Sequence, residues 1–162
     1  MKKKILISIN PEHVQNIING VKKYEYRKIA AKQDISSIII YETTPIKKIV
    51  AEAEIIEVLM LSPNKLWEQT KFESGITKDF FYKYFEGRDV AYAYKLGKIK
   101  VYAQPKTLLD FGVKVAPQSF VYLWWSKVIY KKLLLKVLEN IKYNICKKWG
   151  KVLLTIFVLL NK

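Results

Sequence analysis

The sequence predicts an α+β domain whose strands form a mixed or antiparallel sheet curled into a small barrel, followed by a basic amphipathic helix. Runs with two-residue alternation indicate strands, the helical segments between them are few and irregularly placed, and the composition changes near residue 125. The 162 residues are 51% apolar and 27% charged, which suits one domain with an appendage and excludes a disordered chain. We place the domain at residues 1–124 and the extension at residues 125–162.

The first elements are a strand, a helix and a glycine stop. Residues 5–9 form an apolar run typical of a buried strand. Asn10 can cap a helix, and Pro11 suits the first helical position, where a missing N–H group costs nothing. Apolar residues then recur at spacings of three and four until Gly20, which we expect to adopt the left-handed conformation that ends the helix.

The later elements do not alternate strictly between strand and helix, and this pattern favours α+β over a doubly wound sheet. The strand predicted over residues 49–61 is long, and we expect a bulge or bend in it. Thr77 is expected to cap the helix that follows it. A turn is predicted near Gly97. Trp67 and the aromatic residues of 80–85 are expected to pack in the core. In chain order we predict strands over 22–28, 37–43 and 49–61, helices over 63–71 and 78–85, and strands over 90–104 and 121–123.

The charge balance favours a polyanionic partner. The chain has 29 Lys and Arg against 14 Asp and Glu, a net charge of +15. Cys146 and His13 are the single residues of their kinds, so the sequence predicts no internal disulfide, no Cys/His metal site and no cofactor. We expect His13 to be a solvated helix residue. The lone cysteine and an N-terminal apolar run too short for a secretory signal favour a cytoplasmic location.

The densest group of chemically active residues lies at 20–28, directly after the first helix. In a strand, Lys23, Glu25 and Arg27 share one face, and Lys22 and Tyr26 lie on the other. Glu25 can pair with Arg27 and orient the guanidinium toward a phosphate or a base edge. The alternative interpretation is an edge strand that is kept soluble by its charges.

These residues carry a resemblance. The segment ILISINPEHVQNIINGVKKYEYRK is similar to the N-terminal signature of ASCH domains, a branch of the PUA-like superfamily, in which Gly-x-Lys-x-x-Glu-x-Arg follows a Pro-started helix. Gly20, Lys22, Glu25 and Arg27 occupy those places. Further similarity appears at residues 41–45, 66–67, 75–85 and 117–122, so that the resemblance covers residues 4–123.

The resemblance implies a small PUA-like barrel with flanking helices and a cleft that binds RNA or a modified nucleotide, with regulation as one possible role. Tyr41 and Thr43 alternate onto one face, where Tyr41 can stack on a base. Gln118 can read a base edge, and Ser119 can contact a phosphate. The predicted nucleic-acid-binding residues are Lys22, Lys23, Glu25, Arg27, Tyr41, Thr43, Gln118 and Ser119.

An enzyme is the alternative. The resemblance implies this because some small bacterial members of the family are amidohydrolases of N4-acetylcytidine that use Lys, Thr and Glu. Lys22 matches that lysine, and Lys22 and Glu25 are the catalytic candidates of such an enzyme. Glu25 stands where their Thr is expected, so this pattern is broken and binding is favoured over catalysis. Other members are proposed to cleave RNA with Tyr, Lys and Ser, for which Tyr41, Lys22 and Ser119 are the counterparts. A lysine base needs a pKa well below its usual value of about 10.4.

The last segment has no counterpart in the resemblance. Residues 127–162 hold nine Lys and a single acidic residue, Glu139, and apolar residues recur at helical spacing over 130–149. The apolar run 152–160 is too short to span a bilayer core, which requires about 20 residues. Three interpretations remain open for residues 130–160: self-association or packing on the barrel, an anionic membrane surface, or nucleic-acid phosphates.

Overall fold

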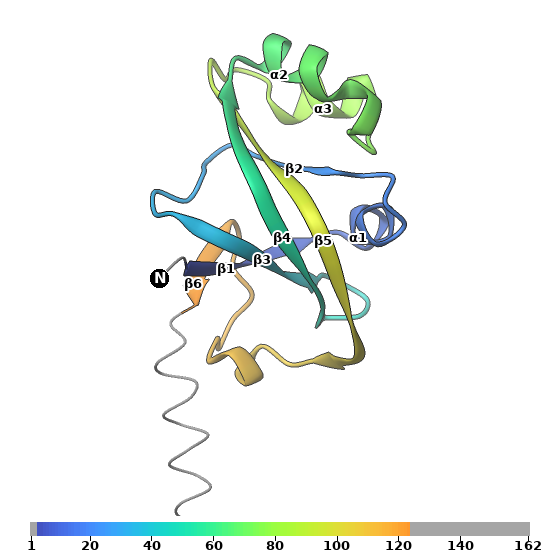
Figure 1. Ribbon diagram of the computed structural model, residues 1–162, viewed down its shortest axis with the longest axis vertical. Helices are drawn as coiled ribbons and strands as arrows, with labels where there is room; N and C mark the ends of the chain where they lie inside the picture. The colour runs from blue at the N-terminus through green and yellow to red at the C-terminus, as the bar shows by residue number, and fades with distance from the viewer. Residues whose placement is uncertain (1–2, 124–162) are drawn as a thin grey trace, which may run out of the picture. The chain divides into compact units, whose positions relative to one another are not determined.

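The structure, a computed structural model, describes residues 3–123. Six strands form one mixed sheet in the order β2-β5-β4-β3-β1-β6, in which β1 runs parallel to β3 and the other neighbours are antiparallel. This arrangement confirms the α+β class. The elements in chain order (Figure 1) are β1 (Lys3–Ile9), α1 (Pro11–Ile18), β2 (Tyr24–Arg27), β3 (Ile35–Glu42), β4 (Lys48–Leu61), α2 (Pro63–Thr70), α3 (Lys78–Tyr84), β5 (Ala91–Lys106) and β6 (Phe120–Leu123), with 3₁₀ turns at Lys71–Glu73 and Leu109–Phe111.

The prediction of a closed barrel is wrong. β2 and β6 are the two edges of the sheet, and no ladder joins them among the described strands. Both edge strands have only four residues, and each is paired on one side alone. β2 has only four residues and pairs with β5, while the guanidinium of Arg27 reaches across to the carbonyl oxygen of Ser8 in β1 at 2.9 Å. This side-chain contact links β2 to β1 and not to the other edge strand, β6, so it does not close the sheet.

The two longest strands are bent without being interrupted. The turn predicted near Gly97 is absent, because β5 continues through this residue to Lys106. The irregularity appears instead as register shifts in β4 around Ile55, as the length of that strand predicted. Gly97 is needed for close packing, since a Cβ atom there would lie 3.0 Å from a side-chain carbon of Ile56.

The helix ends follow the predicted signals with one exception. Gly20 has a φ of +76°, and the hydroxyl of Thr77 accepts a hydrogen bond from the backbone N–H of Phe80, as expected for a cap. Asn10 occupies the N-cap position of α1, but its side chain makes no capping bond. Its Oδ1 accepts a hydrogen bond from the hydroxyl of Thr43 at 3.3 Å instead.

The core consists of three apolar clusters. One lies between the sheet and α1, where Ile5, Ile7, Val14 and Ile17 are almost fully buried. Each such side chain stabilises the fold by about 1.5–3 kcal/mol. A second cluster, which includes Trp67, joins α2 and α3 to the sheet. A third lies on the face of β3 that carries Ile39 and Tyr41, opposite the face that carries Ile38 and Ile40. The first two clusters fix α1 and α3 on either side of β2.

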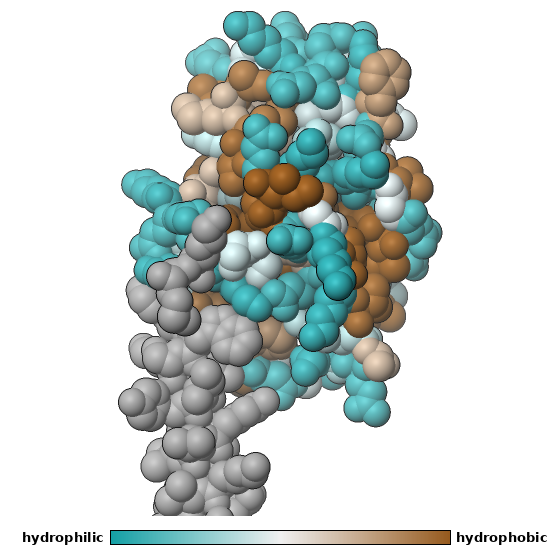
Figure 2. Space-filling view, in the orientation of Figure 1, coloured by the Kyte–Doolittle hydropathy of each residue, from teal (hydrophilic) through white to brown (hydrophobic). Residues whose placement is uncertain are grey.

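The face of the described part seen in Figure 2 carries both polar and apolar side chains. Figure 2 shows apolar side chains over the middle of β4 and β5, where Ile56, Val58 and Met60 are exposed. Among the helices described for residues 3–123, none has the length and apolar character needed to cross a membrane. The predicted amphipathic helix and the interpretations for residues 130–160 lie outside the described residues, so the division into 1–124 and 125–162 remains a prediction.

Candidate functional site

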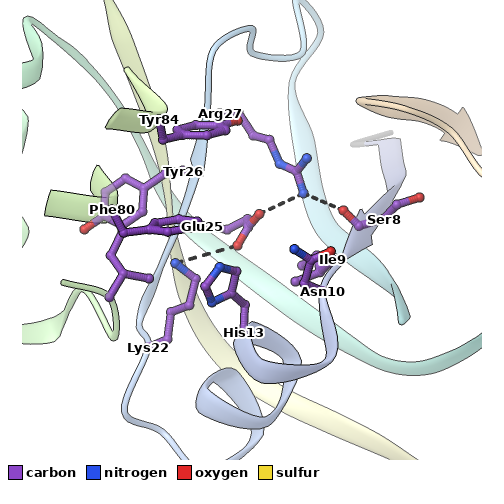
Figure 3. A pocket seen from close by; sticks show the side chains of 11 residues that line it. Ser8, Ile9, Asn10, His13, Lys22, Glu25, Tyr26, Arg27, Phe80 and Tyr84 are labelled. Carbon is purple, nitrogen blue, oxygen red and sulfur yellow. Dashed lines mark hydrogen bonds and ion pairs between the residues drawn. The ribbon is translucent and has the colours of Figure 1, made fainter. Parts of the chain in front are cut away.

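A pocket of about 190 Å³ lies at the open side of the sheet, between the end of β1, α1, β2 and α3 (Figure 3). The lining residues come from three separate stretches of the chain: Ser8, Ile9, Asn10, His13, Lys22, Glu25, Tyr26, Arg27, Ile76, Phe80 and Tyr84.

Lys22 is buried in this pocket by the segment that follows α2. Its backbone N–H donates to the carbonyl oxygen of Asn16 at 2.9 Å, and the Asn16 side chain donates to the carbonyl of Gly75 at 3.1 Å. Gly75 passes so close that a Cβ atom there would lie 2.4 Å from the Cβ of Lys22. The side chain of Lys22 is consequently only 3% exposed.

The ammonium of Lys22 is poorly solvated by the protein. Its nitrogen lies 3.9 Å from the Glu25 carboxylate and 4.6 Å from the centre of the Tyr26 ring, and its one described hydrogen bond, to the carbonyl of Ser74, is long at 3.4 Å. Burial lowers the pKa of Lys22 to about 8, although Glu25 acts in the opposite direction. A cation with three donors and a single long bond is ready to accept an anionic or carbonyl oxygen from a ligand.

Glu25 and Arg27 form the ion pair that strand alternation predicted. An Nη atom of Arg27 lies 2.8 Å from the Glu25 carboxylate, and the same nitrogen donates to the carbonyl of Ser8. The Nε atom of Arg27 is buried and has no hydrogen-bond partner among the described residues. Because a guanidinium stays protonated, this N–H group can only be satisfied by an acceptor.

His13 belongs to the pocket, and the prediction that it is a solvated helix residue is wrong. Its Nδ1 atom is buried without a hydrogen-bond partner in the described part of the chain, and its ring meets the ring of Phe80 edge-on at 5.1 Å. Burial lowers the pKa of His13, and the charge of Lys22 adds to this effect. The sequence did carry a signal for partial burial of His13, since this residue adjoins Val14 at the edge of the apolar stripe of α1.

Two more lining residues were expected in the core. Phe81 and Phe85 are indeed buried, but the ring of Phe80 is 45% exposed and turns toward the pocket, together with Tyr84. Residues at i and i+4 lie on one face of a helix, so Phe81 and Phe85 share the buried face of α3 while Phe80 and Tyr84 share the neighbouring face. The face that carries Phe80 and Tyr84 thus forms an aromatic wall (Figure 3).

The eight predicted binding residues are only partly brought together. Lys22, Glu25 and Arg27 line the pocket, and Thr43 contacts its edge through Asn10. Lys23 does not line it, because β2 begins only at Tyr24 and Lys23 turns outward to pair with Glu73.

The other predicted residues lie away from the pocket. Tyr41 is buried in the cluster that contains Leu6 and Ile39, because successive β3 residues alternate between two faces. Gln118 and Ser119 precede β6 and are absent from the lining, although the neighbouring Pro117 accepts a hydrogen bond from Ser8. Over residues 3–123, no group of three or more His, Cys, Asp or Glu side chains is arranged to hold a metal ion.

Fold and pocket together define a small α+β domain with a cation-lined pocket at the open edge of its sheet. Residues 11–120 match the family described as a domain of unknown function, DUF365, and the chain belongs to this family. The crystal structure of ASCH from Zymomonas mobilis superposes with a TM-score of 0.71 and 27% identity, covering 82% of this chain and 94% of that one. The predicted membership of the ASCH domains is thereby confirmed.

Two curated relatives extend the comparison. The ASCH domain-containing ribonuclease of Zymomonas mobilis is 30% identical over 96 residues, which are 59% of this chain and 65% of that protein. The ATP synthase subunit alpha of Ureaplasma parvum is 27% identical over 123 residues, or 75% of this chain. The chain spans only 15% of that relative's length.

Proposed function

We propose that the pocket binds RNA or a modified nucleotide and receives one nucleotide unit at a time. The observation that carries the proposal is that two cations, the buried Lys22 and the largely buried Arg27, meet in one small cavity with N–H groups that the residues of 3–123 do not fully satisfy. Phosphate and base carbonyl oxygens are the acceptors that such groups bind well. A volume of about 190 Å³ suits a single base or phosphate and excludes a folded duplex.

The walls of the pocket suit the remainder of a nucleotide. Phe80 and Tyr84 offer aromatic faces, and unpaired bases in single-stranded RNA stack on such faces. Glu25 holds Arg27 in place and offers the acceptor atoms that a base amino group requires. A relative that is named a ribonuclease supports RNA as the partner at the level of the family.

The test is a binding titration with matched variants of the full chain. A labelled single-stranded RNA is titrated with wild type, Lys22→Met and Lys23→Met. We expect Lys22→Met to weaken binding at least about tenfold and Lys23→Met to leave it within about threefold, because Lys23 lies outside the pocket. The affinity of wild type should fall steeply with salt, since phosphate contacts release counterions. Equal affinity of the two variants, or an affinity independent of salt, contradicts the proposal.

A second candidate function is hydrolysis of an acylated nucleoside. The low pKa of Lys22, about 8, is the property that favours it, because a lysine must lose its proton before it can act as a base. Glu25 argues against it, since its carboxylate is already paired with Arg27. Incubation with N4-acetylcytidine separates the two functions: release of cytidine by wild type but not by Lys22→Met supports the hydrolase, and binding without release supports the binding domain.

A further inference from the structure

We propose that two copies of this chain pair through the free edge of β4 at residues 57–61, in an antiparallel arrangement with twofold symmetry. The two β4 strands lie side by side in this dimer and join the two sheets into one. β4 contributes no residue to the lining of the pocket, so the inference is independent of the proposed function.

The edge is free because β4 has a neighbouring strand on both sides only over its first half. β3 pairs with β4 as far as Glu54, whereas β5 continues beside it to Leu61, and Figure 1 shows β4 and β5 continuing past β3 toward α2 and α3. Successive residues of an antiparallel strand turn their backbone N–H and C=O groups to alternate sides, so every second residue of 57–61 directs these groups away from β5. No strand among residues 3–123 pairs with them on that side.

This edge lacks the side chains that commonly protect edge strands from pairing. Natural edges often carry lysine or proline, which oppose the addition of another strand. Residues 49–61 contain no Lys, Arg or Pro, although the chain has 29 Lys and Arg and β5 alone carries four Lys. Val58 and Met60 are apolar and are 43% and 63% exposed. An exposed apolar edge of this kind is a template for pairing with another chain.

A second copy fits this edge because residues 57–61 are complementary to themselves. The ladder with β5 is regular over these five residues, and a twofold axis through Leu59 is the one that pairs all five with their counterparts. In this register Val58 lies opposite Met60 of the second copy, so the exposed apolar side chains cover each other. Glu57 lies opposite Leu61 and far from its own counterpart, so like charges do not face each other.

The charge of the chain permits this contact in spite of a net charge of +15. The charged residues of 49–61 are Glu52, Glu54 and Glu57, and Lys95 of β5 lies opposite Glu57 in the ladder. Repulsion between two cationic chains is therefore weak at this edge. Because the interface is small, we expect a reversible dimer with a Kd on the order of 10⁻⁵ M.

The experiment measures the Kd of dimerisation of the full chain by sedimentation velocity over a series of concentrations. Val58→Lys/Met60→Lys places Lys opposite Lys in the paired edges, and Val58→Glu/Met60→Glu places Glu opposite Glu. Both positions are exposed, and the thermal unfolding of each variant checks that it folds. Val101→Lys/Val115→Lys is the matched control, since it adds the same charge at exposed positions outside residues 57–61.

We expect wild type to dimerise, both β4 variants to raise the Kd at least about 30-fold and the control to stay within about threefold. An equimolar mixture of the two β4 variants should associate again, because Lys then lies opposite Glu, and native mass spectrometry should detect the mixed dimer.

Wild type that remains monomeric up to about 300 µM overturns the inference, whether the edge is open or another part of the same chain covers it. Assembly into species larger than a dimer also overturns it, since a twofold contact closes on itself. Dimerisation that the β4 variants leave unchanged would place the contact elsewhere. Equal losses in the control and in the β4 variants would mean that net charge alone decides association, which again contradicts the proposal.

Discussion

Replacing Lys22 with methionine should stabilise the protein while it removes ligand binding. Lys22 is buried, and its pKa falls from 10.5 to about 8, chiefly because burial disfavours the charged form. One pKa unit corresponds to about 1.4 kcal/mol, so keeping this ammonium protonated costs the folded state about 3 kcal/mol at pH 7. Methionine has a similar length and no charge, and Glu25 keeps its pair with Arg27 at 2.8 Å.

The pH dependence gives this prediction a second readout. Between pH 8 and 10.5 the unfolded chain retains a proton on Lys22 that the folded chain has released, so wild-type stability rises with pH in this window. Below pH 8 both states are protonated and Lys22→Met keeps its full advantage, which should then shrink toward zero as the pH approaches 10.5. Tyrosine ionisation contributes equally to both proteins and cancels in the difference.

Urea unfolding followed by tryptophan fluorescence measures the difference at intervals from pH 7 to pH 10. Lys23→Met is the matched control, because Lys23 is exposed and its replacement should change stability little. A Lys22→Met protein that is less stable than wild type at pH 7, with a difference independent of pH, would refute the reasoning. It would mean that the attraction to Glu25 exceeds the cost of burying Lys22.

Three further predictions concern substitutions of Glu25, of two glycines and of Glu52. Glu25→Gln should destabilise the protein by about 3–5 kcal/mol in urea unfolding, because it leaves the buried Lys22 and the largely buried Arg27 without their counter-charge. Unchanged stability would contradict this ion-pair network. Gly75→Ala should destabilise the fold and weaken RNA binding, since the new Cβ atom would lie 2.4 Å from the Cβ of Lys22. Gly87→Ala is the control: it lies in open space with a φ of +69°, so it should show only the backbone cost of about 1–2 kcal/mol and bind RNA normally. Glu52 accepts hydrogen bonds from Lys4, Ser37 and Tyr102 that lower its pKa despite partial burial, so wild type should lose stability relative to Glu52→Gln as the pH falls below 4.5; parallel stability curves would contradict this.

Strand alternation predicted part of the site and misplaced part of it. It correctly paired Glu25 with Arg27, because both lie within β2. It put Lys22 on the opposite face from Glu25, yet the two approach to 3.9 Å, since β2 starts at Tyr24 and the rule does not apply before it. Because β2 starts only after Lys23, this residue also escapes the alternation and turns outward.

Other parts of the site had no adequate signal along the chain. The burial of Lys22 depends on residues 73–75, which lie about 50 positions away and reach it only because the second apolar cluster holds α2 and α3 against the sheet. The inclusion of Phe80 and Tyr84 depends on which face of α3 meets the pocket, and an amphipathic pattern with aromatic residues on both faces does not decide that.

By itself, the sequence determined the element order, the α+β class and the positions of Lys22, Glu25 and Arg27 after the first helix, because these follow from local periodicity, capping and spacing. The family came from the resemblance of its motifs to ASCH domains. Tertiary structure alone decided that the sheet stays open, that a pocket occupies the opening and that His13 enters it. The physical reason is that solvation and pKa are set by neighbours distant in the chain. The cost of burying Lys22 and the free nitrogens of His13 and Arg27 exist only once β1, α1, β2 and α3 have come together.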